Sequence, residues 1–271
     1  MLDQVLGDLE SRVSKGISQD LKSSKGWRTK AVYALGLRVR GYLFRTRGRL
    51  LRAVADYTAA ARLWRELDIL AESAETLNNL GYALTFLGEF GDARALVKNA
   101  VELRKQIGPR YPVGLSLNTL AIVSLYEGNY NAAIRDTERA LAIFRGLDHK
   151  RGIGLANLNM AEALRRRSQT DEIPDAEQKI SLLRDARRRA MDALDIFQEK
   201  VKETSHEVEA LIELGCAFRD WAKVLRNTWG SESEVRRLAR QAQDAFESAV
   251  ETAGETLLYR KVDALVNHAW L

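Results

Sequence analysis

Small residues recur in this chain at a fixed interval of 40 residues, and this interval constrains the fold more than any other feature of the sequence. Three series share it: Gly41, Gly81, Ala121 and Ala161; Gly48, Gly88, Gly128 and Ser168; and Ala53, Ala93 and Ala133. A fixed period of about 20 to 50 residues is typical of repeat architectures, in which each unit buries its apolar faces by stacking on its neighbours. The chain is therefore predicted to be a solenoid.

Each unit is predicted to be a helical hairpin. Apolar residues on both sides of Gly48, Gly88 and Gly128 follow the spacing of an amphipathic helix, and glycine commonly ends helices at a left-handed position. Only 3 prolines and 7% aromatic residues argue against a β-sandwich or barrel, and 46% apolar residues are too many for a disordered chain. We expect an all-α fold without strands, with eleven helices over 27–271, turns near 48, 88 and 128, and a capping helix at about 3–14.

The repeat also predicts the organisation of the chain. We expect an N-terminal capping helix and linker at 1–26 and a solenoid over 27–271. Its hairpins are expected at about 27–67, 69–107, 111–147, 149–200 and 202–254, with a partial sixth at 255–271. Small residues let helix backbones approach closely, so Gly81 is expected to contact the second helix of its own hairpin.

Two later hairpins carry extra residues at their turns. The interval from the small residue of the first helix to the first alanine of the second is 12 in the early repeats, but 25 from Ala161 to Ala186 and 27 from Gly215 to Ala242. The insertions at 166–180 and 221–233 are predicted to project side by side as a lobe. Trp221 and Trp229 are too large to be buried there together, so the lobe is expected to be a partner or self-association surface.

The repeat resembles the tetratricopeptide repeat family. The residues that carry the resemblance are Leu-x-x-Leu-Gly at 77–81, Gly-x-Phe at 88–90, Gly-x-Tyr at 128–130, and the alanines at 93 and 100. The period differs from the family's commonest 34 residues, and no proline follows the second helix. Units of this length resemble those in bacterial regulators and in the sensor arms of signalling ATPases. The resemblance implies a right-handed superhelix whose first helices line a concave face that holds peptides or partner proteins.

If this geometry holds, the residues around each small residue of the first helices form the candidate binding surface. They are Arg38, Tyr42, Arg45, Asn78, Asn79, Tyr82, Asn118, Thr119, Asn159, Glu162 and Arg165. An asparagine amide can pair with a peptide backbone irrespective of its sequence, and arginine pairs with carboxylates. The resemblance implies that Asn79, Asn118 and Asn159 clamp the peptide. The alternative is that these amides form hydrogen bonds between helices.

The charge is unevenly distributed. Residues 27–67 contain ten basic and two acidic residues, hence +8, whereas the whole chain has a net charge of +5. This basic first repeat favours an acidic partner, or less readily a nucleic acid, because aromatic residues suited to base stacking are few. The alternative is a solvated, arginine-rich face.

The sequence contains no pattern typical of catalysis. It lacks a phosphate-binding loop, HExxH and GxSxG, and its three histidines lie far apart. A single cysteine, Cys216, excludes an internal disulfide and a cysteine-based zinc site, and the N-terminus lacks the pattern of a signal peptide. We predict a non-enzymatic protein of the cytoplasm, without cofactor or metal and without membrane contact, that serves as a peptide-binding scaffold or regulatory sensor module.

The end of the sequence suggests a further contact. Successive repeats place the next small residue at about 270, where the sequence stops, and Leu265, Val266 and Trp270 give this last helix too many apolar side chains for one covered face. We expect a longer parent protein, or a second copy or further domain that covers this end. A self-association module of a larger signalling protein therefore stays an alternative to peptide binding. The alternative to a covered end is a lone capping helix that ends the solenoid.

Overall fold

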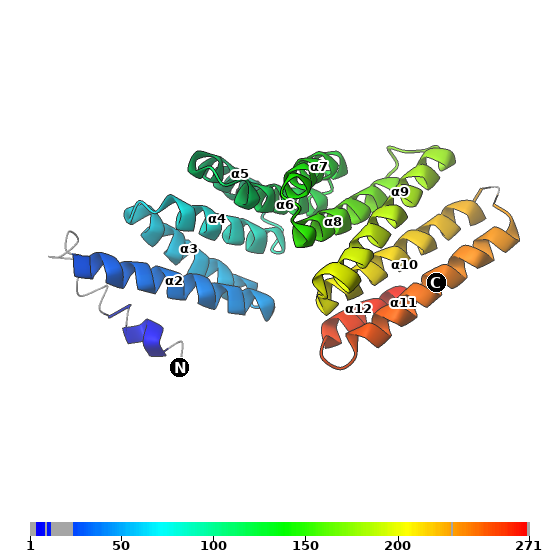
Figure 1. Cartoon of the computed structure of the whole chain (residues 1–271). Coiled ribbons are helices and arrows are strands. Elements are labelled where there is room, and N and C mark those ends of the chain that lie inside the picture. Colours follow the sequence, from blue (N-terminus) through cyan, green and yellow to red (C-terminus); the bar gives the residue numbers. More distant parts are fainter. Residues whose placement is uncertain (1–3, 9, 12–23, 229, 270–271) are drawn as a thin grey trace. The chain divides into compact units, whose positions relative to one another are not determined.

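The computed structural model describes residues 4–8, 10–11, 24–228 and 230–269 (Figure 1). Eleven α-helices lie between Ser24 and His268, as predicted, and the described part of the chain contains no strand. Residues 4–8, 10 and 11 are also helical and belong to the expected capping helix. The all-α fold is therefore confirmed. The right-handed superhelix stays a prediction from the resemblance.

The chain divides into two compact units, residues 1–127 and 128–271, a division that the repeat pattern did not predict. The helices of unit 1 are α2 (Ser24–Thr46), α3 (Leu50–Glu66), α4 (Leu70–Thr85), α5 (Phe90–Ile107) and α6 (Arg110–Tyr126). Each of them packs on the next one along the chain, and the first helices also contact one another, α2 with α4 and α4 with α6. Unit 1 therefore consists of two helical hairpins, α2 with α3 and α4 with α5, and of α6, which packs on the second of them.

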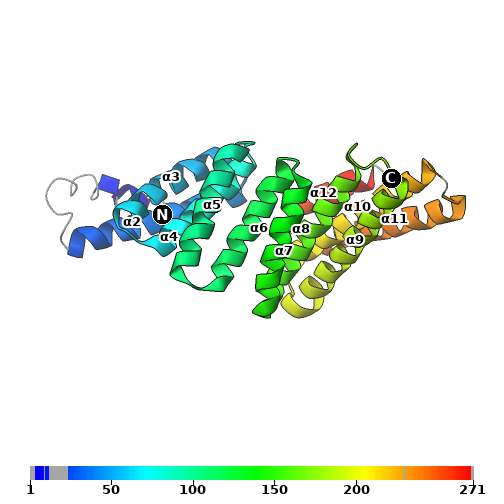
Figure 2. The same cartoon turned by 90° about the horizontal axis from the view of Figure 1, so that it is seen from above.

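The helices of unit 2 are α7 (Tyr130–Gly146), α8 (Lys150–Ser168), α9 (Ala176–Asp195), α10 (Thr204–Arg226), α11 (Glu232–Ala253) and α12 (Leu258–His268). In unit 2 each helix also packs on the next one along the chain, and α8 to α11 are longer than α3 to α6 of unit 1 (Figure 2). A π-helix, Ile196–Val201, continues α9. Most residues of the two insertions extend these helices, which leaves short connections at 169–175 and 227–231.

The turns explain how a 40-residue repeat arises. Six residues with positive φ follow one another at intervals of 20: Gly48, Asp68, Gly88, Gly108, Gly128 and Asp148. At the first of them, the Gly48 amide donates to the Arg45 carbonyl at 3.0 Å and the Arg49 amide donates to the Phe44 carbonyl at 2.8 Å, the two bonds of a Schellman motif. Aspartate replaces glycine at two positions because its short polar side chain tolerates this conformation. Each helix from α3 to α7 with its turn therefore occupies 20 residues, and two of them form one repeat.

The small residues allow close helix contacts, as expected. A Cβ atom on Gly81 would lie 2.5 Å from Val97 Cγ2 and 2.9 Å from the carbonyl oxygen of Ala93, both in α5. One on Gly41 would lie 2.9 Å from the ring of Tyr57 in α3. The first helix of each of these hairpins thus contacts its partner without room for a methyl group.

The Gly81→Ala variant is therefore expected to lower the free energy of unfolding by about 1–2 kcal/mol, because overpacking against a backbone oxygen outweighs alanine's better helix propensity. Gly91, in the first turn of α5, is the matched control because a Cβ atom there would meet nothing within 4 Å. Gly91→Ala should be neutral or stabilise by about 0.5 kcal/mol. Denaturant unfolding of both variants measures the difference, and equal effects would contradict the close packing at Gly81.

Candidate functional site

The candidate site lies on unit 1, on the exposed side of α2, α4 and α6. Because α4 contacts both α2 and α6, matching positions of the three helices become neighbours (Figure 1). We call the exposed residues of these three helices the first-helix face. Each helix buries its other side chains: Leu37 of α2, Leu80 of α4 and Leu120 of α6 are at most 6% exposed. The core thus fixes which residues reach this face.

A row of aromatic rings and one arginine crosses the first-helix face. The Arg45 guanidinium lies over the rings of Tyr42 and Tyr82, at 5.0 and 4.7 Å from their centroids. The Phe86 ring lies 4.9 Å from that of Tyr82 and 4.9 Å from that of Tyr126. We call these five residues the aromatic row. Cation–π and ring contacts of this kind hold the side chains in place before any partner binds.

The aromatic row remains open to solvent. Tyr42, Phe86 and Tyr126 are 50%, 38% and 40% exposed. Aromatic side chains lose little conformational entropy on binding and supply a large contact area, which makes them typical anchors of protein interfaces. The row therefore has the chemistry of a protein-binding surface.

A buried polar network lies beside the row. Arg104, from the second helix α5, forms an ion pair with Glu75 and donates to Ser116 Oγ at 2.7 Å. The Ser116 hydroxyl in turn donates to Asn78 Oδ1 at 3.0 Å, and Asn79 Nδ2 donates to Glu75 Oε1 at 3.4 Å. Burial lowers the pKa of Arg104, and the Glu75 carboxylate opposes this shift. The hydrogen bond between Ser116 and Asn78 joins α6 to α4. This is the alternative to peptide binding that the sequence left open for Asn78.

The structure divides the eleven candidate residues between the two units. Eight belong to unit 1: Arg38, Tyr42, Arg45, Asn78, Asn79, Tyr82, Asn118 and Thr119. Of these, Asn78, Asn118 and Thr119 are buried, and Arg38 forms an ion pair with Glu72 at 3.1 Å. The aromatic row contains three of the eight, Tyr42, Arg45 and Tyr82. Peptide contact by any of the eleven stays a prediction.

Asn159, Glu162 and Arg165 belong to unit 2. Glu162 forms an ion pair with Arg166 on the surface of α8 at 2.6 Å. Arg165 is 11% exposed and pairs with the buried carboxylates Glu213 and Asp220 of α10. The Arg165 guanidinium is therefore already bound to carboxylates of its own chain.

Sequence reasoning missed Phe86 and Tyr126, although a signal was present. They lie 40 residues apart, each two residues before a turn glycine. The candidate binding positions extend up to four residues after each small residue of the first helices. Phe86 and Tyr126 lie five residues after Gly81 and Ala121. The 40-residue period applied to exposed aromatic residues would have found both.

The basic first repeat is partly neutralised. Lys30 pairs with Glu66 at 3.0 Å, and Arg40 makes two hydrogen bonds of 2.7 Å with the buried carboxylate of Asp56. With Arg38, and with Arg62, which lies 3.9 Å from Glu66, these account for four of the ten basic residues. The remaining excess still lies along α2 and α3, so the first repeat keeps its positive character.

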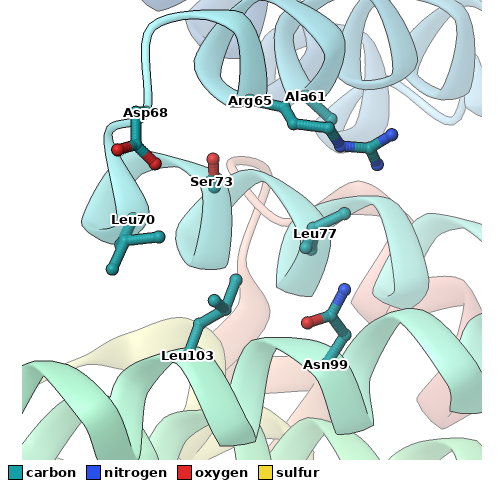
Figure 3. A pocket seen from close by; sticks show the side chains of 8 residues that line it. All are labelled: Ala61, Arg65, Asp68, Leu70, Ser73, Leu77, Asn99 and Leu103. Atoms are coloured by element: carbon teal, nitrogen blue, oxygen red, sulfur yellow. The ribbon is translucent and has the colours of Figure 1, made fainter.

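Unit 1 also has a small cavity, and none of the residues of the aromatic row lines it (Figure 3). Its volume is about 170 Å³, and its lining comes from α3, α4, α5 and the connection between α3 and α4: Ala61, Arg65, Asp68, Leu70, Ser73, Leu77, Asn99 and Leu103. Several of these side chains are exposed and the cavity is shallow. It lacks the convergent buried polar groups of a small-molecule site.

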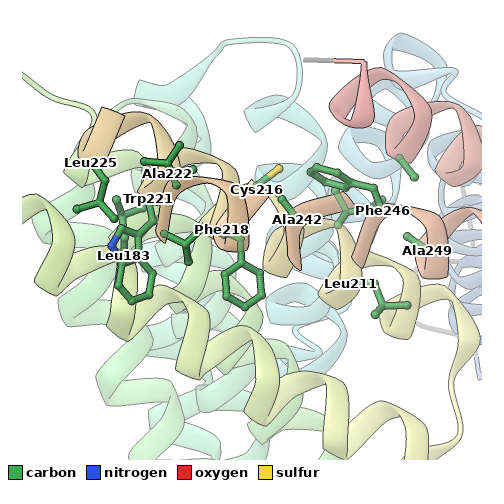
Figure 4. Packing of buried hydrophobic residues seen from close by; sticks show 14 of the residues in the cluster. Leu183, Leu211, Cys216, Phe218, Trp221, Ala222, Leu225, Ala242, Phe246 and Ala249 are labelled. Atoms are coloured by element: carbon green, nitrogen blue, oxygen red, sulfur yellow. The ribbon is translucent and has the colours of Figure 1, made fainter. Parts of the chain in front are cut away.

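The packing of Trp221 corrects the prediction that the lobe exposes this side chain. This side chain is 8% exposed and lies in the core of unit 2 with Leu183, Ala222 and Leu225 (Figure 4). The expected exposed apolar patch at this residue is wrong, because the indole packs in a core built from the extended helices α9, α10 and α11. Trp229 lies outside the described residues.

The described residues also bear on a metal site, on a membrane span and on the reactivity of Cys216. No three or more His, Cys, Asp or Glu side chains gather there in a way that could hold a metal ion. None of the helices described is both long and apolar enough for a bilayer span. Cys216 is 3% exposed, and burial raises the pKa of its thiol to about 12.

Comparison with known proteins supports the repeat. Residues 73–107, which include most of α4 and all of α5, match the tetratricopeptide repeat family. No curated protein sequence matches this chain. Among solved structures, BtubC (BKLC) from P. vanneervenii is similar with a TM-score of 0.62 and 15% identity over 93% of this chain and 90% of that one.

A second similar structure is a putative kinesin light chain from Podosopora anserina with nearly identical TPR-like repeats. Its TM-score is 0.54 and its identity 13%, over 78% of this chain and 94% of that one. At such identities these likenesses show the fold alone. The sequence match shows a tetratricopeptide repeat at 73–107, and the solved structures show that the stacked helices of this chain share the fold of tetratricopeptide-like repeat proteins.

Proposed function

We propose that this chain is a non-enzymatic scaffold or sensor module of the cytoplasm that holds a segment of a partner protein on the first-helix face of unit 1. The observation that carries the proposal is the aromatic row. Three of its four rings are exposed and that of Tyr82 is half-buried, yet they are fixed by mutual contacts and by Arg45, so binding does not have to order them. Exposed and pre-ordered aromatic side chains are typical of interface anchors.

The polar network beside the row supports this assignment. It links α4, α5 and α6 through buried side chains, so the rows of residues on α4 and α6 keep their spacing. A rigid surface loses less entropy on association than a mobile one. Asn79 lies at the edge of this network, half-buried, and is the asparagine of unit 1 best placed to reach a bound peptide.

A peptide selection tests the proposal. Peptides from a random library displayed on phage are selected on the whole chain, and the strongest are measured by fluorescence anisotropy. The Tyr82→Ala/Phe86→Ala variant is expected to bind them at least tenfold more weakly, because it removes the centre of the aromatic row.

The matched control is Leu51→Ala, an apolar residue of α3 that is 74% exposed and outside the first-helix face. Its affinity should equal that of the wild type. Thermal melting of each variant separates lost binding from lost folding. The proposal fails if no peptide binds saturably, or if the double variant is folded and binds as well as the wild type.

A further inference from the structure

The helix α2 has two apolar faces, but the described residues cover only one of them. The covered face contains Tyr33, Ala34 and Leu37, which are at most 9% exposed and pack with residues of α3. The second face consists of Val32, Leu35, Val39, Tyr42 and Leu43, which are 54%, 43%, 45%, 50% and 38% exposed. We call these five residues the α2 ridge. A helix that is apolar on more than one side normally packs against more than one neighbour.

The α2 ridge has the form of a helix-packing surface. At 3.6 residues per turn its five residues fall within roughly 100° of the helix circumference, the width of the apolar stripe by which helices pack on proteins. From Val32 to Leu43 it is about 17 Å long, or about three turns. Successive spacings of three and four residues form a ridge that fits between the side chains of another helix.

The positive charge around the α2 ridge favours an acidic partner. The 23 residues of α2 include six basic residues and no acidic one. Lys30, Arg38 and Arg40 pair with carboxylates of other helices. Arg28 is exposed at the N-terminal end of the ridge, and Arg45 lies on its flank toward α4, where its guanidinium contacts two tyrosine rings. A helix that lies along the ridge therefore meets positive charge at one end and on one side.

A second copy of α2 does not fit this surface. Apposed α2 helices would bring basic residues against basic residues with no acidic side chain from either helix to offset them. Strand addition is also excluded on this unit, because its described residues offer no sheet edge. The remaining mode of binding is the docking of an amphipathic helix whose apolar stripe is flanked by acidic residues.

We infer that the α2 ridge binds an acidic amphipathic helix of a partner protein. The inference rests on the proposed function, since Tyr42 belongs both to the ridge and to the aromatic row, and it names the class of partner for this face. The partner helix lies along α2 with its apolar residues between Val32, Val39 and Leu43. Its carboxylates face Arg28 and Arg45.

The test uses a designed peptide of about 18 residues, a helix of about 27 Å, with leucine at positions a and d of each heptad and glutamate at e and g. A matched peptide has lysine in place of glutamate, and a third has the same composition in an order without an apolar stripe. Fluorescence anisotropy with the whole chain should show saturable binding of the glutamate peptide, at least tenfold tighter than that of the other two. Raising the salt from about 0.05 to about 0.5 M should weaken it severalfold.

Variants of the α2 ridge test whether the glutamate peptide binds there. Val39→Asp should weaken binding of the glutamate peptide at least tenfold, and Val32→Ser provides a milder substitution if the first variant melts early. The matched control is Val262→Asp, at a valine of α12 that is 52% exposed, and it should bind as the wild type does. Equal binding of the lysine peptide, or undiminished binding by folded Val39→Asp, overturns the inference.

Two further outcomes separate the inference from its alternatives. If light scattering shows a dimer that Val39→Asp dissociates, the occupant is a second copy and the inference is wrong. If the designed peptide fails to bind while phage-selected peptides bind through Tyr82 and Phe86, the inference fails and the proposed function stands. If neither the designed peptide nor any phage-selected peptide binds, both the inference and the proposed function are contradicted.

Discussion

The Arg165→Ala variant is expected to lose about 3–5 kcal/mol of unfolding free energy, because it leaves the buried carboxylate of Glu213 without its cation. Arg165 Nε lies 2.5 Å from Glu213 Oε1, and its Nη1 lies 3.2 Å from Asp220 Oδ2. The three side chains are 11%, 9% and 5% exposed. Arg219 also contacts Asp220, but Glu213 depends on Arg165 for its charge partner. Denaturant unfolding measures the loss.

The effect is expected to depend on pH. Burial lowers the pKa of Arg165, but its anionic neighbours, Glu213 first and then Asp220, together outweigh burial and raise that pKa above its ordinary value, so the arginine stays charged. Burial raises the pKa of Glu213, and Arg165 opposes this shift. Without Arg165 the pKa of Glu213 should rise further. A carboxyl group with a raised pKa destabilises the fold as pH increases above its unfolded value of about 4.3, and protonation relieves this as pH falls. The variant should therefore be closer to the wild type at about pH 5 than at about pH 8.

The neighbouring residue provides a control. Arg166 pairs with Glu162 within α8, where the side chains are 35% and 24% exposed. Its replacement by alanine should lose at most about 1 kcal/mol and show little dependence on pH. The Arg165→Met/Glu213→Leu variant should recover most of the stability, because it removes both buried charges of the pair. Equal losses at positions 165 and 166 would contradict a buried network.

The sequence predicted the helices and turns of this fold for a local reason. Small residues at a fixed interval specify where helices approach, and the residue at a left-handed position specifies where a helix ends. Gly81 therefore meets α5, and Gly48 and Gly88 end α2 and α4, as expected. These features depend on residues within one repeat, so one repeat's pattern is sufficient to place them.

The candidate site was harder to predict because it depends on contacts between repeats. Asn78 was assigned to a ligand, yet Ser116 binds it from the next first helix, 38 residues away. Arg165 is bound by carboxylates 48 and 55 residues away, in a part of the chain where insertions break the 40-residue period. A polar side chain on a first helix can face either a ligand or the following helix, and its position in the repeat is the same in both cases.

Replacement of Trp221 by alanine is expected to lower the free energy of unfolding by about 3–5 kcal/mol, the range for a buried aromatic side chain. The indole packs with Leu183 of α9 and with Ala222 and Leu225 of its own helix, and the Arg184 guanidinium lies 5.2 Å from its ring (Figure 4). Removal of the ring leaves a cavity where three α-helices meet, α9, α10 and α11, and their long backbones cannot collapse into it fully. Denaturant unfolding measures the loss, and hydrogen exchange should show faster opening of α10.

The matched control for this variant is Arg184→Ala, which removes only the exposed cation over the ring and should lose about 0.5–1 kcal/mol. The comparison decides between a core role and a surface role for the extended helices of unit 2. If Trp221 instead formed a surface for a partner, its replacement would change stability by less than about 1 kcal/mol and would weaken self-association in light scattering. A large loss of stability with an unchanged molecular mass places the indole among the residues that hold α9, α10 and α11 together, and leaves the first-helix face of unit 1 as the better candidate for binding.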